Sequence, residues 1–161
     1  MKPDSRGSRP AVPHRECLTA DAKRLRALQR ELQRLQEAGI EQDPRLLQSF
    51  LFGDTRIRQV IDGWLDQKLS FDAIFASSDV TAISLMSSLK ERGIAIPSQV
   101  RLVGYDDIAL TEHVHPTLTT IRPPTAEAGR ALVDLLFEAL AGQPRRAIVL
   151  PAELIRRESS A

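Results

Sequence analysis

The sequence lacks the features that would point to a secreted, membrane-bound or strongly charged protein. Its 161 residues include one cysteine, Cys17, so no internal disulfide can form. The 22 Lys and Arg residues are balanced by 21 Asp and Glu residues, so charge alone provides no strong attraction to nucleic acid. No apolar run is long enough to cross a bilayer, and the first residues carry charge and prolines in place of the apolar core of a signal peptide. We therefore expect a soluble, cytoplasmic protein without membrane contact.

The sequence also lacks the motifs of common catalytic and cofactor sites. It contains no G-x-S-x-G elbow, no P-loop, no G-x-G-x-x-G and no paired-cysteine metal motif. His113 and His115 alternate along one short segment, but no third ligand follows at a spacing that zinc would require. Asp106 and Asp107 are neighbours, which on an extended backbone point to opposite faces and do not flank one substrate atom. We therefore expect no catalysis, no metal and no cofactor.

Apolar runs and helical patterns alternate along the chain, which indicates an α/β fold. The 42% hydrophobic content is sufficient for the core of a single domain. Strands and helices joined by short links predict parallel strands, right-handed crossovers and a doubly wound, mainly parallel sheet. Strands are expected at 46–52, 71–76, 100–105, 118–121 and 147–150, the last reaching at most to Ile155. Helices are expected at 56–67, 80–92 and 126–140, the last with Thr125 as its N-cap.

The N-terminal part divides into two segments. Residues 1–19 combine prolines, glycine, serines and arginines, a composition that buries little and predicts a disordered segment. The remainder, 20–161, is expected to form the domain. Its first segment, 20–38, carries leucines at alternating steps of three and four, which predicts an amphipathic helix. The same spacing occurs in coiled coils, but two heptads are fewer than a coiled coil needs, so a packed surface helix is favoured and a partner-binding face is the alternative.

Polar residues follow three of the expected strands. The carboxyl ends of parallel strands meet at one edge of a sheet, so Thr55, Ser78, Asp79 and Asp106 are expected to surround one crevice. Of the two neighbouring aspartates, we expect one to face the crevice and the other to hold the loop or cap the next segment. A carboxylate at an apolar-walled crevice suits a polyol, sugar or nucleoside, because it accepts hydrogen bonds from hydroxyls. In the alternative, both aspartates only terminate a strand.

Several segments together resemble the effector-binding domain of the lactose-repressor (LacI/GalR) family of bacterial transcription regulators. They cover most of the chain from residue 71 to residue 159. In order they read FDAIFASSD (71–79), KERGIAIP (90–97), VGYDDI (103–108), PTLTTI (116–121), AGRALVDLL (128–136) and LPAELIRRES (150–159).

The resemblance implies a periplasmic-binding-protein-like fold of type I, in which two α/β subdomains close on a small effector, often a sugar or purine. Family members carry a helix-turn-helix headpiece that reads an operator as a dimer. Nothing before about residue 20 matches that headpiece or the first half of the N-terminal subdomain. We therefore expect the C-terminal half of a regulator, with no direct DNA contact. The apolar face of the helix at 126–140 should then lack part of its cover and favour association.

The resemblance also implies roles for individual residues. The first aspartate of the Gly-Tyr-Asp-Asp turn, Asp106, corresponds to an acid that contacts effector. Ser78 stands where the family usually has an effector-binding Asn, and Thr55 stands where an aromatic residue usually stacks on effector. An effector-binding arginine corresponds to Arg24 or Arg26. The dimer interface of the family corresponds to Ile83, His113 and Val114.

We therefore expect the sensor module of a LacI/GalR-type regulator that binds a small polar metabolite. One alternative is a ligand-free partner that pairs as a homodimer or as a heterodimer with a full-length regulator, or a non-functional fragment of a regulator. Another is a receiver-like signalling domain, suggested by acids at strand ends. A receiver needs its acid pair before the phosphorylated Asp and a Lys after it, an order that Asp79, Asp106 and Asp107 do not follow.

Overall fold

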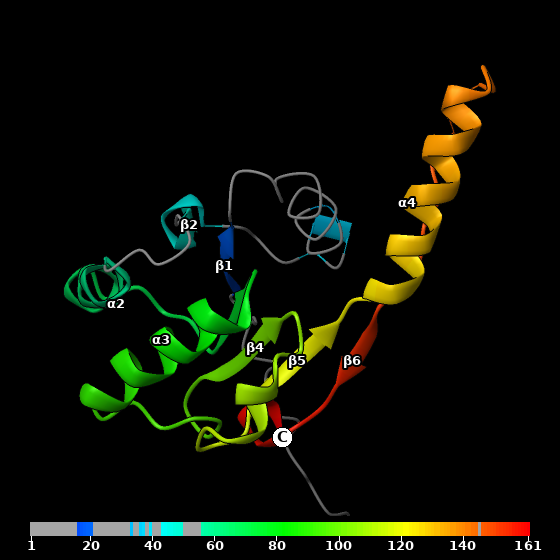
Figure 1. Ribbon diagram of the computed structural model, residues 1–161. Coiled ribbons are helices and arrows are strands. Elements are labelled where there is room, and N and C mark those ends of the chain that lie inside the picture. The colour runs from blue at the N-terminus through cyan, green and yellow to red at the C-terminus, as the bar shows by residue number, and fades with distance from the viewer. Residues whose placement is uncertain are drawn as a thin grey trace, which may run out of the picture.

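A six-stranded, mainly parallel sheet organises the fold (Figure 1). The computed structural model describes residues 16–20, 33, 36–37, 39, 43–49, 56–144 and 146–161. The strands lie in the order β2-β1-β3-β4-β5-β6, and each neighbouring pair is parallel except β5 and β6. The first five strands have the order of a doubly wound sheet, which confirms the predicted fold class.

Among the described elements, strands alternate with helices or 3-10 turns. The strands are β1 (Glu16–Ala20), β2 (Leu47–Ser49), β3 (Ala73–Ala76), β4 (Arg101–Tyr105), β5 (Thr119–Arg122) and β6 (Glu153–Ile155). The helices are α2 (Ile57–Asp66), α3 (Asp79–Glu91) and α4 (Thr125–Leu140), with 3-10 turns η2 (Pro44–Leu46), η3 (Ala109–Glu112) and η4 (Glu158–Ser160). Among the described residues, no helix combines the length and apolar character needed to span a bilayer.

The disorder predicted for 1–19 is wrong at residues 16–19, because they belong to strand β1. This strand lies inside the sheet, where it pairs with both β2 and β3. The prediction treated the first 19 residues as one polar block, whereas two flanking parallel strands supply backbone partners for β1. Residues 1–15 lie outside the described part. Of the helix predicted at 20–38, the structure describes residues 20, 33, 36 and 37. Ala20 ends strand β1, so the predicted start of the helix is wrong, whereas the other three residues are helical.

Three smaller predictions also need correction. Within the strand expected at 46–52, Leu46 ends η2, and β2 runs over the next three residues. Residues 147–150 form no strand; the last strand, β6, lies within the extension to Ile155 that the sequence allowed, where it pairs with β5 in antiparallel orientation. Thr125 is the first residue of α4 and not its cap, since the cap position is held by Pro124.

The core lies between the sheet and the pair of helices α2 and α3. Apolar side chains from these helices, including the fully buried Ile61, Leu85 and Leu89, pack with Ile74 of β3 and Leu102 of β4. Trp64 of α2 is also buried, and its indole N–H donates to the carbonyl of Arg45 at 3.0 Å. These contacts fix the position of β3 and β4, whose carboxyl ends carry the candidate site.

Helix α4 stands apart from the rest of the fold (Figure 1). No residue of α4, all of which the structure describes, is buried. Between 51% and 75% of each large apolar side chain on one side of the helix is exposed: Leu132, Val133, Leu136, Phe137 and Leu140. This confirms the expectation that the apolar face of this helix lacks cover.

The exposed face of α4 leads to a prediction about association. Replacing Leu132 and Leu136 together by serine should reduce concentration-dependent self-association, because large exposed apolar patches drive association. The folded domain should lose less than about 1 kcal/mol, since neither side chain is buried. Analytical ultracentrifugation and thermal melts measure the two effects.

The matched control changes the polar side of the same helix, with Glu127 and Arg130 both replaced by serine. These residues form an exposed ion pair of 3.6 Å, and their loss should leave association unchanged. Equal effects of the two double variants would contradict an apolar contact surface on α4.

Candidate functional site

The carboxyl ends of β3 and β4 lie side by side and carry the candidate residues. Ser78 and Asp79 follow β3, and Asp106 and Asp107 follow β4, its parallel neighbour. A hydrogen bond of 3.0 Å from the backbone N–H of Ile108 to Oδ2 of Asp79 joins the two loops. The structure therefore brings these predicted residues to one edge of the sheet.

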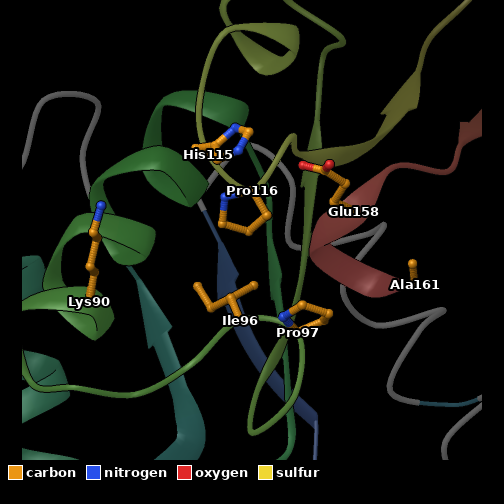
Figure 2. Close-up of a pocket in the computed structure, with 7 residues that line it drawn as sticks. All are labelled: Lys90, Ile96, Pro97, His115, Pro116, Glu158 and Ala161. Atoms are coloured by element: carbon orange, nitrogen blue, oxygen red, sulfur yellow. The ribbon is translucent and has the colours of Figure 1, made fainter.

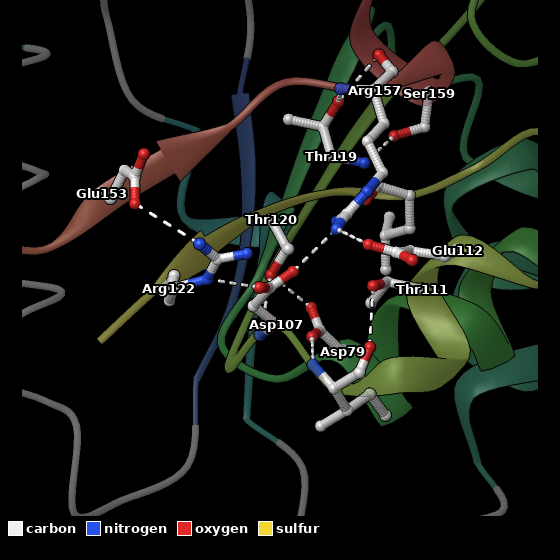
Figure 3. A network of polar contacts seen from close by, with 12 residues as sticks. Asp79, Asp107, Thr111, Glu112, Thr119, Thr120, Arg122, Glu153, Arg157 and Ser159 are labelled. Atoms are coloured by element: carbon white, nitrogen blue, oxygen red, sulfur yellow. Dashed lines mark hydrogen bonds and ion pairs between the residues drawn. The ribbon is translucent and has the colours of Figure 1, made fainter. Parts of the chain in front are cut away.

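Asp79 holds this edge together and does not line a crevice. Its side chain is fully buried. Besides the bond from Ile108, it accepts a hydrogen bond of 2.6 Å from the hydroxyl of Thr120 on β5 (Figure 3). Since Asp79 begins α3, one carboxyl group links that helix to the β4 loop and to β5. The expectation that Asp79 surrounds a crevice is therefore wrong.

Gly104 is required by the close approach of Asp79. A Cβ atom at this position would lie 2.2 Å from Oδ1 of Asp79 and 3.1 Å from Cδ2 of Leu118. Carbon and oxygen atoms that are not bonded cannot approach so closely. The glycine in the Val-Gly-Tyr-Asp-Asp segment thus makes room for a buried carboxyl group from the neighbouring loop.

The two aspartates after β4 have an unusual backbone. Asp106 has φ +118° and Asp107 has φ +53°, so the assumption of an extended backbone at this pair was wrong. The turn is held by β5, since the Asp106 N–H donates to the carbonyl of Ile121 at 2.9 Å. The Asp107 N–H donates to the hydroxyl of Thr120 at 3.3 Å. Asp and Asn tolerate positive φ better than most residues with a side chain, and surrounding contacts must maintain it.

Asp107 holds the loop through two arginines. Its carboxylate accepts hydrogen bonds from Nε of Arg122 at 2.6 Å and from a guanidinium nitrogen of Arg157 at 3.0 Å, and its side chain is only 8% exposed (Figure 3). Burial alone would raise the pKa of Asp107, but the hydrogen bonds and positive charges of Arg122 and Arg157 hold that pKa below its usual range. The expectation that one aspartate of the pair holds the loop is confirmed for Asp107.

Acid should weaken this contact. Because the pKa of Asp107 is lower in the folded protein than its ordinary value of 3.8, the unfolded chain takes up the proton first. The stabilisation is therefore complete above pH 3.8 and disappears as pH falls through the folded-state pKa. In Asp107→Asn, we expect the free energy of unfolding to be lower by about 2 kcal/mol at pH 7, as for hydrogen bonds to charged groups.

Urea titrations of both proteins from pH 7 to about pH 2.5 test this, since the two stability curves should converge in acid. A gap between the curves that stays constant with pH would show that the charge of Asp107 is not responsible.

Ser78 has a structural task at the same edge. It is the N-cap of α3, where its hydroxyl accepts from the Thr81 N–H at 3.2 Å and donates to the Thr81 hydroxyl at 2.9 Å. Asp106 is half-buried beside it at the neighbouring loop. Thr55, Arg24 and Arg26 lie outside the described residues. Effector contact by all five residues stays a prediction.

The predicted interface residues lie on and near α3. Ile83 and Val114 are half-buried and pack against the domain's own core, whereas His113 is exposed. The structure contains one chain, so their role in dimerisation stays a prediction. Within the described ranges, no group of three or more His, Cys, Asp or Glu side chains is placed to hold a metal ion.

A shallow pocket of about 550 Å³ lies at the opposite end of the sheet, before β4 and β5 (Figure 2). Its lining residues are Lys90, Ile96, Pro97, His115, Pro116, Glu158 and Ala161. The N–H of Thr117 donates to Glu158 at 2.8 Å and, with the Thr117 side chain, holds the pKa of Glu158 below its usual range. No single sequence motif marks this pocket, because its residues come from four separate segments.

Comparison with known protein families matches residues 14–160 to the periplasmic binding protein-like domain. The chain belongs to this family. The matched region includes every described strand and helix, so the family assignment and the observed fold agree.

Curated relatives of this periplasmic-binding-protein-like chain include transcriptional regulators. It is 32% identical to the HTH-type transcriptional regulator CelR of Thermobifida fusca over 128 residues, which are 76% of this chain and 36% of that protein. It is 35% identical to the HTH-type transcriptional repressor CytR of Escherichia coli K12 over 120 residues, which are 72% of this chain and 34% of that protein. The chain thus spans about a third of the length of these relatives.

Solved structures agree with these relatives. A CelR–cellobiose complex superimposes with a TM-score of 0.81 at 30% identity, covering 91% of this chain and 47% of that one. The Escherichia coli repressor AscG gives a TM-score of 0.76 at 26% identity, with 91% and 55% covered. The resemblance to the sensor domain of LacI-type regulators is therefore confirmed, and the receiver-like alternative gains no support.

Proposed function

We propose that this chain senses a small polar effector, such as a sugar or nucleoside, for a LacI-type regulator of transcription, and that it does so without catalysis. One observation carries the proposal. The turn with Asp106 lies at the carboxyl edge of a parallel sheet, where such sheets bind ligands, and Asp107 holds that turn in place through Arg122 and Arg157. The relative CelR, whose structure contains cellobiose, supports a sugar as the first effector to test.

Asp106 is the central effector contact in this proposal. A carboxylate can accept hydrogen bonds from two hydroxyl groups, and hydrogen bonds to charged acceptors are the stronger ones. Ser78, Thr55 and either Arg24 or Arg26 are proposed to complete the effector contacts. The chain corresponds to the C-terminal half of such a regulator, so the other wall of the crevice comes from a second subdomain.

Dimerisation belongs to the same proposal. The chain pairs with a second copy, or with a full-length regulator, through a surface that includes Ile83, His113 and Val114. His113 is exposed and lies next to Val114 on the segment that follows η3.

Isothermal titration calorimetry tests effector binding. Cellobiose is titrated first, followed by a panel of mono- and disaccharides and nucleosides. For a compound that binds, Asp106→Asn should weaken affinity at least about tenfold, as expected for loss of a hydrogen bond to a charged group. The matched control is Asp66→Asn, which removes an exposed carboxylate from the end of α2.

Equal losses in the two variants would remove Asp106 from the site. If no compound of the panel produced heat with the wild-type chain, the ligand-free partner would replace the sensor as the favoured function. The exposed apolar face of α4 is the observation that supports this second candidate, since such a face favours association.

A further inference from the structure

The carboxylate of Asp107 lies between the two passages of chain that connect the sheet with α4. The chain leaves the sheet at Arg122, the last residue of β5, and only Pro123 and Pro124 separate this residue from α4. It returns through β6, and Arg157 follows that strand (Figure 1). Since Arg122 and Arg157 both donate to Asp107, one side chain joins the outgoing and the returning passage (Figure 3).

Arg157 is more buried than Arg122 and makes more contacts with the rest of the domain. Arg157 is only 12% exposed, and it also donates to the carbonyl of Leu118 at 3.0 Å and to Glu112 at 2.9 Å. Arg122 is 51% exposed, and besides Asp107 it faces Glu153 of β6 at 3.5 Å. Arg157 therefore anchors Asp107 to the body of the domain, whereas Arg122 connects it to the less restrained passage toward α4.

The turn that carries Asp107 is held by β5, the strand that ends at Arg122. Its backbone N–H groups at Asp106 and Asp107 donate to Ile121 and Thr120 of β5, and both aspartates have positive φ. A backbone of this kind persists only where its surroundings hold it. A displacement of β5 or of the passage after it therefore changes the contacts that maintain the turn.

We propose that Asp107 is a positioning residue that couples the placement of α4 to the conformation of the Asp106 turn. The coupling itself requires no ligand. Its role in regulation rests on the proposed function, because an effector bound at Asp106 would then restrict the position of α4. If the effector changes the affinity of α4 for a partner by some factor, the bound partner changes the affinity for the effector by the same factor.

The first test measures the placement of α4 without ligand. Spin labels are attached at Arg130→Cys on α4 and Ser87→Cys on α3, both exposed positions, in a chain with Cys17→Ser. Pulsed electron paramagnetic resonance then gives the distribution of distances between them. We expect Asp107→Asn to broaden and shift this distribution in protein that circular dichroism shows to be folded.

Two further variants make this test specific. Arg122→Gln should reproduce the broadening, because it removes the ion pair between Asp107 and the chain segment that leads to α4. Arg122→Gln takes the place of Asp107→Asn in this test if Asp107→Asn does not fold. Glu112→Gln is the matched control, since its exposed side chain accepts a hydrogen bond from Arg157 and acts on Arg122 through its charge alone. It should leave the distribution as in the wild type.

The second test adds cellobiose as the probe. In the wild type, saturating cellobiose should narrow the distance distribution, whereas in Asp107→Asn it should bind about tenfold more weakly and leave the distribution broad even at saturation. A merely structural Asp107 would leave the response at saturation unchanged.

The outcomes separate the two proposals. Identical ligand-free distributions in wild type, Asp107→Asn and Arg122→Gln, or equal broadening in Glu112→Gln, would overturn the coupling whatever cellobiose does. Absence of any heat with cellobiose and the panel counts against the proposed function, while the ligand-free comparison still decides the coupling.

Discussion

Gly104→Ala is expected to destabilise the protein by about 3 kcal/mol or more, at the upper end of overpacking costs. The added methyl group would lie 2.2 Å from Oδ1 of Asp79, whose carboxyl group is fully buried and held by two hydrogen bonds. A displaced Asp79 loses its hydrogen bonds to Thr120 and Ile108, so a steric cost is joined by the cost of unsatisfied buried groups. Urea unfolding followed by circular dichroism measures the change.

Gly129→Ala is the matched control for this substitution. Apart from its chain neighbours and the backbone of the helix itself, no atom lies within 4 Å of the position that a Cβ would take at Gly129, an interior position of α4. Since alanine favours helix over glycine by about 1 kcal/mol, stability should stay equal or rise slightly. A loss at Gly104 no greater than the change at Gly129 would mean that the contact with Asp79 is not as close as the structure has it.

Asp79→Ala should have an effect of similar size, about 3 kcal/mol, because it leaves the part-buried N–H of Ile108 and the buried hydroxyl of Thr120 without their acceptor. The cavity left by the carboxyl group adds to this cost. Since Asp79 connects α3, the turn after β4 and β5, its loss should also increase hydrogen exchange at the amides of Asp106 and Asp107.

Asp79→Asn provides the comparison that isolates the acceptor atoms. Its Oδ1 can still accept one of the two hydrogen bonds, whereas its amide group introduces donors at a place where Asp79 only accepts. We expect a loss intermediate between wild type and Asp79→Ala. If Asp79→Ala were as stable as the wild type, Asp79 would not be the residue that joins these loops.

The fold was largely predictable because strongly apolar strands alternate with amphipathic helices. The runs at 71–76 and 100–105 predicted β3 and β4, and the spacing of apolar residues at 80–92 predicted α3. Strand β1 was missed because five residues next to a proline-rich and polar segment carry too weak a pattern. Its pairing with two neighbouring strands, and not its own composition, places it in the sheet.

The candidate site was predictable in position but not in its internal contacts. Residues that follow adjacent parallel strands must meet at one edge, so the sequence indicated that Ser78 and Asp106 lie near each other. It did not indicate that Asp79 is buried between the loops. A buried acid at a strand end needs donors or cations, and this requirement was the one available signal for Arg122 and Arg157.

The sequence by itself determined the α/β class, the family resemblance and the location of a carboxylate turn after β4, because these depend on local patterns and short motifs. Only the tertiary structure decided what the Gly-Tyr-Asp-Asp turn does. Asp107 meets Arg122 and Arg157 from 15 and 50 residues away, and Asp79 meets Thr120 from 41 residues away. Contacts over such separations arise from strand order and loop geometry, which bring together side chains that no local pattern relates.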